Sequence, residues 1–194
     1  MLGFSEIRFG GHPDGALGSV DADVLIGEIV EHLREWRPQV VITFGPEGAP
    51  NARRDHRAIS RAATAAFFAA RIPTLYPEQV ASGLAPHAAS RLYYVAWPPP
   101  PVGAELSGQS LPVTAAIDIR EHHPIKRASF LVHATQQDHL ARFEHLALTA
   151  TEDYHLAAGV PLRTPVVDDL FEGLPLATAP APGRSPMPGR DPSG

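Results

Sequence analysis

The sequence predicts an α/β fold in which a mostly parallel sheet is flanked by helices. Two observations support this. The run "VVITF", residues 40–44, is short, β-branched and apolar throughout, as is typical of a strand that is buried on both faces of a parallel sheet. Helical and strand-like segments also alternate along the chain, which is the pattern of α/β domains.

The first helix is expected over residues 23–36. Its apolar residues recur at helical spacing, and they are Leu25, Ile26, Ile29, Val30, Leu33 and Trp36. Asp21 or Asp23 can cap its start, and Pro38 follows closely enough to stop it. The strand at residues 40–44 comes next.

Further elements continue the alternation. A glycine- and proline-rich loop leads to a helix over residues 56–70, and the segments 91–97 and 113–119 are expected to be strands. Two more helices are expected, over residues 125–133 and 140–149. Ligands of such sheets bind beyond the carboxyl ends of the strands. The loop after Phe44 lies at such an end, and so would the loop that holds His12 if "IRF", residues 7–9, is a strand.

Length and composition fit one globular domain. A chain of 194 residues can bury a core, and a hydrophobic content of 44% is ordinary for a globular protein. Residues 1–172 are expected to form the domain. Residues 173–194 are rich in proline and poor in aromatic residues, so they are expected to be a disordered tail.

Composition also excludes several classes of function. A net charge of −5 gives no basic surface for nucleic acid. The absence of cysteine excludes disulfides, zinc–thiolate sites and thiol catalysis. No apolar run approaches the roughly 18 residues of a membrane span, and no secretory signal is visible. A cytoplasmic location is therefore expected.

Asp55 and His56 are the first candidates for chemistry. They open a predicted helix beyond the carboxyl end of a buried strand, where a carboxylate can cap the helix or orient an imidazole. The residues alone also allow a plainer interpretation, in which Asp55 is only an N-cap and His56 a surface residue.

The other histidines form weaker patterns. His122 and His123 are adjacent, so on a helix their side chains diverge and cannot share a metal ion easily. His133 is near a predicted helix end, where a solvated histidine is the simpler interpretation. The stretch "GGHPDGALG", residues 10–18, invites comparison with a zinc motif, although it can equally be a turn that contains His12.

Several of these segments together resemble a known family. In order, they are "RFGGHPDGAL", "RPQVVITFGPEG", "DHRAISRAATAAF" and "IKRASFLVHATQQ". They are similar to segments of the PIG-L or LmbE-like zinc-dependent N-acetylglucosaminyl deacetylases, from about Gly3 to Tyr154. The resemblance implies a Rossmann-like fold and hydrolysis of the acetyl amide of a small N-acetylated amino-sugar conjugate.

The resemblance also implies roles for individual residues. His56 takes the position of a zinc ligand, and Asp55 the position beside it in the catalytic centre. Arg53 stands where the family has a histidine that acts on the oxyanion or the leaving amine. Asp14 and His133 are placed at the substrate, and His12 aligns with a turn rather than with a ligand.

The same comparison implies an incomplete zinc site. In the family a His-Pro-Asp-Asp motif on an earlier strand supplies two further ligands and a general base. That motif is absent from these residues, which implies that the chain begins after the first strands of the family. Two hypotheses follow: a deacetylase with an additional segment, or a non-catalytic relative that binds a carbohydrate or a protein partner. The oligomeric state cannot be derived from the sequence.

Overall fold

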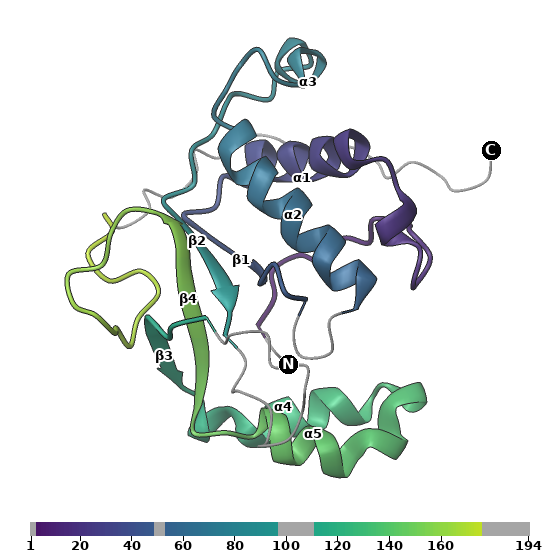
Figure 1. The fold of residues 1–194 in the computed structure, drawn as a ribbon, viewed down its shortest axis with the longest axis vertical. Coiled ribbons are helices and arrows are strands. Elements are labelled where there is room, and N and C mark those ends of the chain that lie inside the picture. Colours follow the sequence, from purple (N-terminus) through teal and green to yellow (C-terminus); the bar gives the residue numbers. More distant parts are fainter. Residues whose placement is uncertain (1–2, 49–52, 97–110, 176–194) are drawn as a thin grey trace.

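The protein is seen here in a computed structural model that describes residues 3–48, 53–96 and 111–175. Its four strands are β1 (Val40–Phe44), β2 (Arg91–Val95), β3 (Ala115–Asp118) and β4 (Thr151–Gly159). The α-helices are α1 (Ala22–Trp36), α2 (Arg54–Ala69), α3 (Pro77–Ala81), α4 (His123–Leu131) and α5 (Leu140–Ala147), with 3-10 turns η1 (Leu17–Ser19), η2 (Arg120–His122) and η3 (Ala134–His139). The strands form one sheet flanked by helices, which confirms the α/β class (Figure 1).

The strand directions differ from the expected parallel arrangement. In the order β1-β2-β4-β3, β1 and β2 are parallel, whereas β4 is antiparallel to both β2 and β3. The reason is the position of α4 and α5, which lie beyond one end of the sheet (Figure 1). The chain leaves β3 at that end and enters β4 from the same end, so it returns antiparallel instead of crossing over to a parallel strand.

The first helix follows the sequence prediction closely. The carboxylate of Asp21 accepts hydrogen bonds from the backbone N–H groups of Asp23 and Val24, so Asp21 is the N-cap. Arg37 ends the helix in the left-handed conformation, with φ of 51°, immediately before Pro38. The apolar side of α1 packs on α2 through buried side chains such as Val30 and Leu33.

Alternate residues of β2 enter different cores on the two faces of the sheet. Leu92 packs with Phe67 of α2 and with Ala89. Tyr93 faces the other way and packs with Tyr154 of β4 and with Val167, from the segment that follows β4. The segment after β4 therefore covers the face of the sheet opposite α2.

Three features depart from the sequence prediction. The strand β4 and the short helix α3 were not expected, and the described residues before α1 contain no strand, so "IRF" is not one. Of the predicted tail, residues 173–175 are described, and the Gln39 Nε2 donates a hydrogen bond of 2.7 Å to the Pro175 carbonyl. Residues 176–194 lie outside the described residues.

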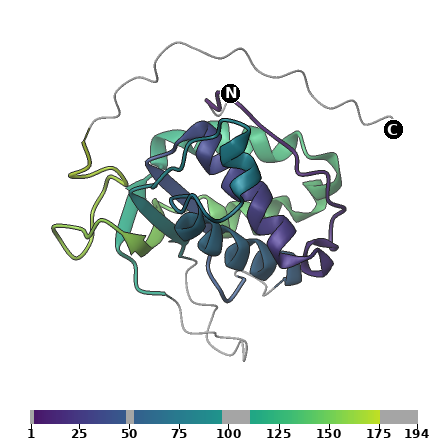
Figure 2. The same ribbon diagram turned by 90° about the horizontal axis from the view of Figure 1, so that it is seen from above.

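The N-terminal segment runs alongside α1 (Figure 2). The Arg8 guanidinium pairs with Glu35 and lies 4.9 Å from the centre of the Trp36 ring. Further along, the His12 Nε2 is 2.8 Å from the Glu28 carboxylate. Among the described residues, no helix is both long and apolar enough to cross a membrane.

Candidate functional site

His56 lies on α2, next to the carboxyl end of β1. Its ring stacks on the Phe44 ring, with centroids 4.0 Å apart and planes 4° apart. Its Nδ1 is 3.3 Å from the carbonyl oxygen of Gly48, in the loop after β1. Gly48 has φ of 73°, a left-handed conformation that suits glycine. The end of β1 and the loop that follows it therefore fix the ring of His56.

Asp55 joins α2 to the loop near the N-terminus. Its carboxylate accepts hydrogen bonds from the backbone N–H of Gly15, at 2.7 Å, and of Gly18, at 3.3 Å. The Arg54 guanidinium adds a bond of 3.1 Å to the Gly18 carbonyl. The capping role predicted for Asp55 is wrong. The N-cap of α2 is Arg53, and the Arg53 side chain makes no capping hydrogen bond.

This link brings predicted site residues from two parts of the chain close together. Asp14 directly precedes Gly15, so the hydrogen bond to Asp55 holds the Asp14 turn beside the start of α2. Arg53 and Asp14 are both exposed. The start of α2 and this turn therefore present an exposed cation and an exposed carboxylate, and His56, also at the start of α2, is half-buried.

His133 is placed differently. It is exposed, directly precedes η3, and lines a cavity of about 670 Å³ between α4, α5 and the start of the described chain. The residues that line this cavity include neither Asp55 nor His56. We call the Asp14 turn and the start of α2, with Asp55 and His56, the loop–helix junction. Among the described residues, the structure does not bring His133 into contact with this junction.

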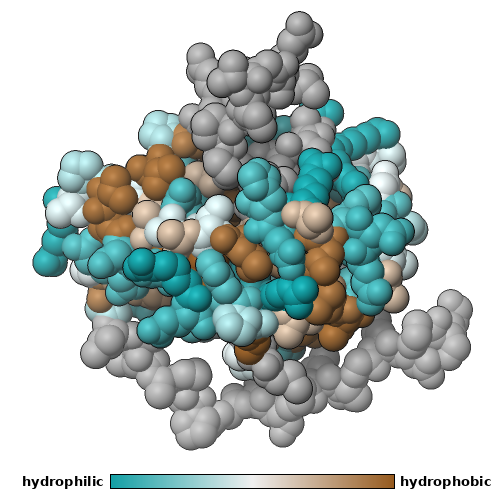
Figure 3. Space-filling model, turned by 90° about the horizontal axis from the view of Figure 1, so that it is seen from below, coloured by the Kyte–Doolittle hydropathy of each residue, from teal (hydrophilic) through white to brown (hydrophobic). Residues whose placement is uncertain are grey.

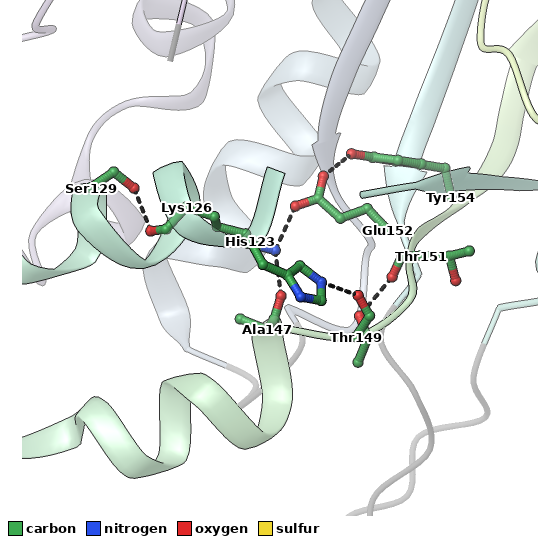
Figure 4. Close-up of polar contacts among 8 residues, drawn as sticks. All are labelled: His123, Lys126, Ser129, Ala147, Thr149, Thr151, Glu152 and Tyr154. Carbon is green, nitrogen blue, oxygen red and sulfur yellow. Dashed lines mark hydrogen bonds and ion pairs between the residues drawn. The ribbon is translucent and has the colours of Figure 1, made fainter. Parts of the chain in front are cut away.

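A polar network at the same cavity was missed by sequence reasoning. The Lys126 Nζ donates 2.6 Å hydrogen bonds to the Ala147 carbonyl and to the Glu152 carboxylate (Figure 4). The Tyr154 hydroxyl donates to the other oxygen of Glu152 at 2.8 Å. The sequence offered one signal for this network. Glu152 and Tyr154 are two positions apart, so on a strand their side chains share a face.

The network shifts the pKa values of its acids in opposite directions. Burial raises the pKa of Tyr154, and the neighbouring Glu152 carboxylate raises it further. Burial alone would also raise the pKa of Glu152. The hydrogen bonds from Lys126 and Tyr154 outweigh that effect and hold the pKa of Glu152 below its ordinary value. Glu152 is therefore a carboxylate at neutral pH.

The loop–helix junction lies in a segment that is similar to a known family. The sequence model of the PIG-L family, described as GlcNAc-PI de-N-acetylase, matches residues 1–67, which hold both halves of the junction. A 1D-myo-inositol 2-acetamido-2-deoxy-alpha-D-glucopyranoside deacetylase of Streptomyces griseus is 32% identical, over 84% of this chain and 58% of that protein. Both the family model and this relative show that the chain is similar to proteins of the PIG-L family.

Other relatives show the same similarity. A deacetylase of the same description from Streptomyces avermitilis is 31% identical, over 84% of this chain and 63% of the relative. The chain thus spans about three fifths of the length of these curated relatives. An N,N'-diacetylchitobiose deacetylase of Pyrococcus horikoshii has the same fold, with a TM-score of 0.56 at 15% identity, over 72% of this chain and 53% of that one.

The resemblance to zinc deacetylases can be tested against the donor atoms present. A catalytic zinc needs three protein ligands from histidine and carboxylate side chains when cysteine is absent. Among the described residues, no three such side chains lie together. His56 is the ligand that the resemblance assigns, and the Asp55 carboxylate is already bonded to two backbone N–H groups. The described residues do not fit a complete zinc site, so no reaction step is derived through one.

The Asp55 link is open to a direct test. We expect D55N to release the Asp14 turn, because the amide keeps one accepting oxygen and places an NH₂ group where the second accepting oxygen was. A charge-assisted bond of this kind is worth about 1.5 kcal/mol, so the protection of the Gly15 and Gly18 amides should fall about tenfold in hydrogen exchange. D14N is the matched control and should leave that protection unchanged. Equal protection in D55N and the parent would contradict the link.

Proposed function

We propose that this chain acts in the deacetylation of an N-acetylglucosaminyl conjugate. Water adds to the acetyl carbonyl and the amide C–N bond breaks, which gives acetate and a free amine. The most direct support is that the relatives from Streptomyces griseus and Streptomyces avermitilis are both described as deacetylases of an N-acetylglucosamine–inositol conjugate. The matching family model also covers the whole junction between the Asp14 turn and α2.

The geometry allows a specific division of roles. The exposed carboxylate of Asp14 would accept hydrogen bonds from sugar hydroxyl groups. The guanidinium of Arg53 would stabilise the negative charge that develops on the carbonyl oxygen. Because its pKa is too high for proton transfer, Arg53 cannot act as the general acid. Asp55 is a positioning residue, since its carboxylate holds the Asp14 turn.

Two further assignments belong to the same proposal. His56, held by Phe44 and Gly48, is the residue that would contribute to a metal centre. His133 would contact a part of the substrate that reaches the cavity beside α4. Zinc is the metal that the resemblance implies for such a centre.

One observation favours a second function. Because the described residues do not supply three metal ligands, the junction can also serve a relative that binds an amino sugar without hydrolysing it. In that case Asp14 and Arg53 would contact the sugar, and affinity would not depend on a metal ion.

The deciding experiment measures metal content and acetate release on the same preparation. The full chain is incubated with the N-acetylglucosamine–inositol conjugate, with and without added Zn²⁺, and R53M and H56Q serve as variants. Acetate release that requires Zn²⁺ and is lost in H56Q would support the deacetylase. Sugar binding without acetate release, unaffected by a chelator, would overturn it in favour of the binding protein.

A further inference from the structure

A groove lies between α1, α2 and the segment that leads to α3, on the side of the molecule away from α4 and α5 (Figure 1). Its volume is about 480 Å³. Three large apolar side chains that line it remain exposed, Phe68 by 47%, Ile72 by 39% and Leu75 by 43%. Figure 3 shows the side of α4 and α5, where hydrophobic patches are interrupted by hydrophilic side chains. Exposed apolar side chains that lie together with a polar rim are typical of surfaces that bind another molecule.

Buried hydrogen bonds hold the apolar side chains of this groove outward. The Arg34 guanidinium donates to the backbone carbonyls of Ile72, Leu75 and Tyr76, over distances between 2.8 and 3.0 Å. Tyr76 itself has φ of 53°, a left-handed conformation that is unfavourable for a bulky residue. Its ring packs on α1 at Gly27, where an added Cβ would lie 2.8 Å from the ring. The groove is therefore preformed, and binding there requires little further ordering of the backbone.

The α1 side of the groove is acidic. The Asp23 carboxylate lines the groove. Burial raises the pKa of the Tyr76 hydroxyl, and the carboxylates of Asp23, Glu78 and Asp21 raise it further, so all three acids lie near the Tyr76 ring. All three are exposed, and no ion pair among the described residues includes them. These carboxylates can therefore pair with a cation of another molecule.

The α2 side of the groove carries a cation. The Arg71 guanidinium lies 5.3 Å from the centre of the Phe68 ring and 5.7 Å from that of the Phe67 ring. Phe68 lines the groove and Phe67 does not, so Arg71 lies beside the groove, beyond Phe68. Arg71 is exposed and also belongs to no ion pair within the described part of the chain. Arg61, the preceding cation of α2, lies two turns before Phe68 and does not line the groove.

This surface is complementary to itself. An exposed ring, that of Phe68, stands next to a hollow large enough for an aromatic side chain, and a guanidinium stands across the groove from carboxylates. A two-fold axis through such a surface places each feature against its complement in a second copy. Phe68 of each copy then enters the groove of the other, and Arg71 of each meets the acidic side of the other. Opposite charges on the facing sides also disfavour a shifted register.

We propose that two copies of this chain associate through this groove as a two-fold symmetric dimer, in which Phe68 and Arg71 of each copy contact the groove and Asp23 of the other. The inference does not rest on the proposed deacetylation, because none of these residues belongs to the loop–helix junction. The groove is small, so the dimer is expected to be weak, with a Kd of about 10 μM.

Sedimentation velocity of the full chain measures this association directly. The parent should shift from one chain to two between about 1 and about 100 μM. F68S should weaken the dimer at least about tenfold, because it removes the ring that fills the groove of the other copy. F171S is the matched control, since Phe171 is 50% exposed and does not line the groove, and it should dimerise as the parent does.

Charge reversal separates contact between copies from an effect within one copy. R71E and D23K should each weaken self-association about tenfold, because each places like charges against one another in the dimer. An equimolar mixture of the two variants should dimerise as tightly as the parent. In the mixed dimer the new carboxylate of R71E meets the new ammonium of D23K, and the unchanged Asp23 and Arg71 meet each other. Variants that had lost association only because they misfold would not regain it on mixing.

Four outcomes would overturn the proposal. The first is a parent that remains a single chain at about 200 μM. The second is a mixture of R71E and D23K that associates no more tightly than either variant alone. The third is that F68S, shown to be folded by circular dichroism, dimerises as F171S does. The fourth is growth beyond two chains, which would indicate a head-to-tail contact instead of a two-fold one.

Discussion

Replacing Arg34 by methionine should lower the free energy of unfolding by about 3–4 kcal/mol. Arg34 lies in α1 and is only 2% exposed. All five of its N–H groups donate hydrogen bonds, and the acceptors are the carbonyls of Ala70, Ile72, Leu75 and Tyr76 and the side chain of Gln79. Methionine fills a similar volume but donates none of these bonds, each of which is charge-assisted.

The measurement is urea unfolding followed by circular dichroism. R61M makes the same chemical change at an exposed position of α2 and should alter stability by less than about 0.5 kcal/mol. R34K keeps the charge but not the planar fork of donors, so it should fall between the two. If R34M and R61M unfold at the same urea concentration, the role assigned to Arg34 is wrong.

The position of Arg34 explains why one side chain has so large an effect. The segment that it binds, residues 70–79, leaves the end of α2 and makes most of its turns through irregular backbone. Because the carbonyls of this segment converge on a side chain of α1, Arg34 fixes the end of α2 to α1. The start of α2 carries Asp55 and His56, so α2 has the hydrogen bonds of Arg34 at one end and the candidate site at the other.

The sequence was most informative where a local pattern determines the structure. The apolar spacing in residues 23–36, the cap at Asp21 and the stop at Pro38 all act within a few turns of one helix, and α1 has nearly the predicted bounds. The strand β4 lacked such a pattern. "TEDYHLAAG" begins with polar residues and ends with small ones, and only pairing with β2 and β3 on both sides makes it a strand.

The candidate site could be predicted only in part for a similar reason. The sequence indicated Asp55 and His56 as candidates, but not that the Asp55 carboxylate would bond to Gly15 and Gly18, some forty positions away. A carboxylate early in a helix has the same local pattern whether it caps that helix or binds a distant loop. His133 likewise lies at a cavity whose walls come from several elements, which periodicity alone cannot join.

Replacing Lys126 by methionine should have the second largest effect, a loss of about 2 kcal/mol at pH 7. Lys126 joins α4 to the end of α5, through Ala147, and to β4, through Glu152. Without the ammonium, a partly buried carboxylate loses its counter-charge, and that is costly even with some solvent contact. The double variant K126M/E152Q removes both charges and should recover part of the loss. R127M on α4 is the control, because the Arg127 side chain is 46% exposed against 23% for Lys126, while the two partner carboxylates are about equally exposed.

The pH dependence gives a second, independent measure of the same pair. The folded protein holds the pKa of Glu152 below its ordinary value, so Glu152 binds its proton more readily in the unfolded chain. Its contribution to stability is then fully present above the ordinary pKa of 4.5 and is lost as the pH falls through the lower folded value. The parent should therefore lose more stability than K126M/E152Q between pH 6 and pH 3. Parallel stability curves for the two proteins over that range would mean that the ion pair does not connect the α4–α5 helices to the sheet.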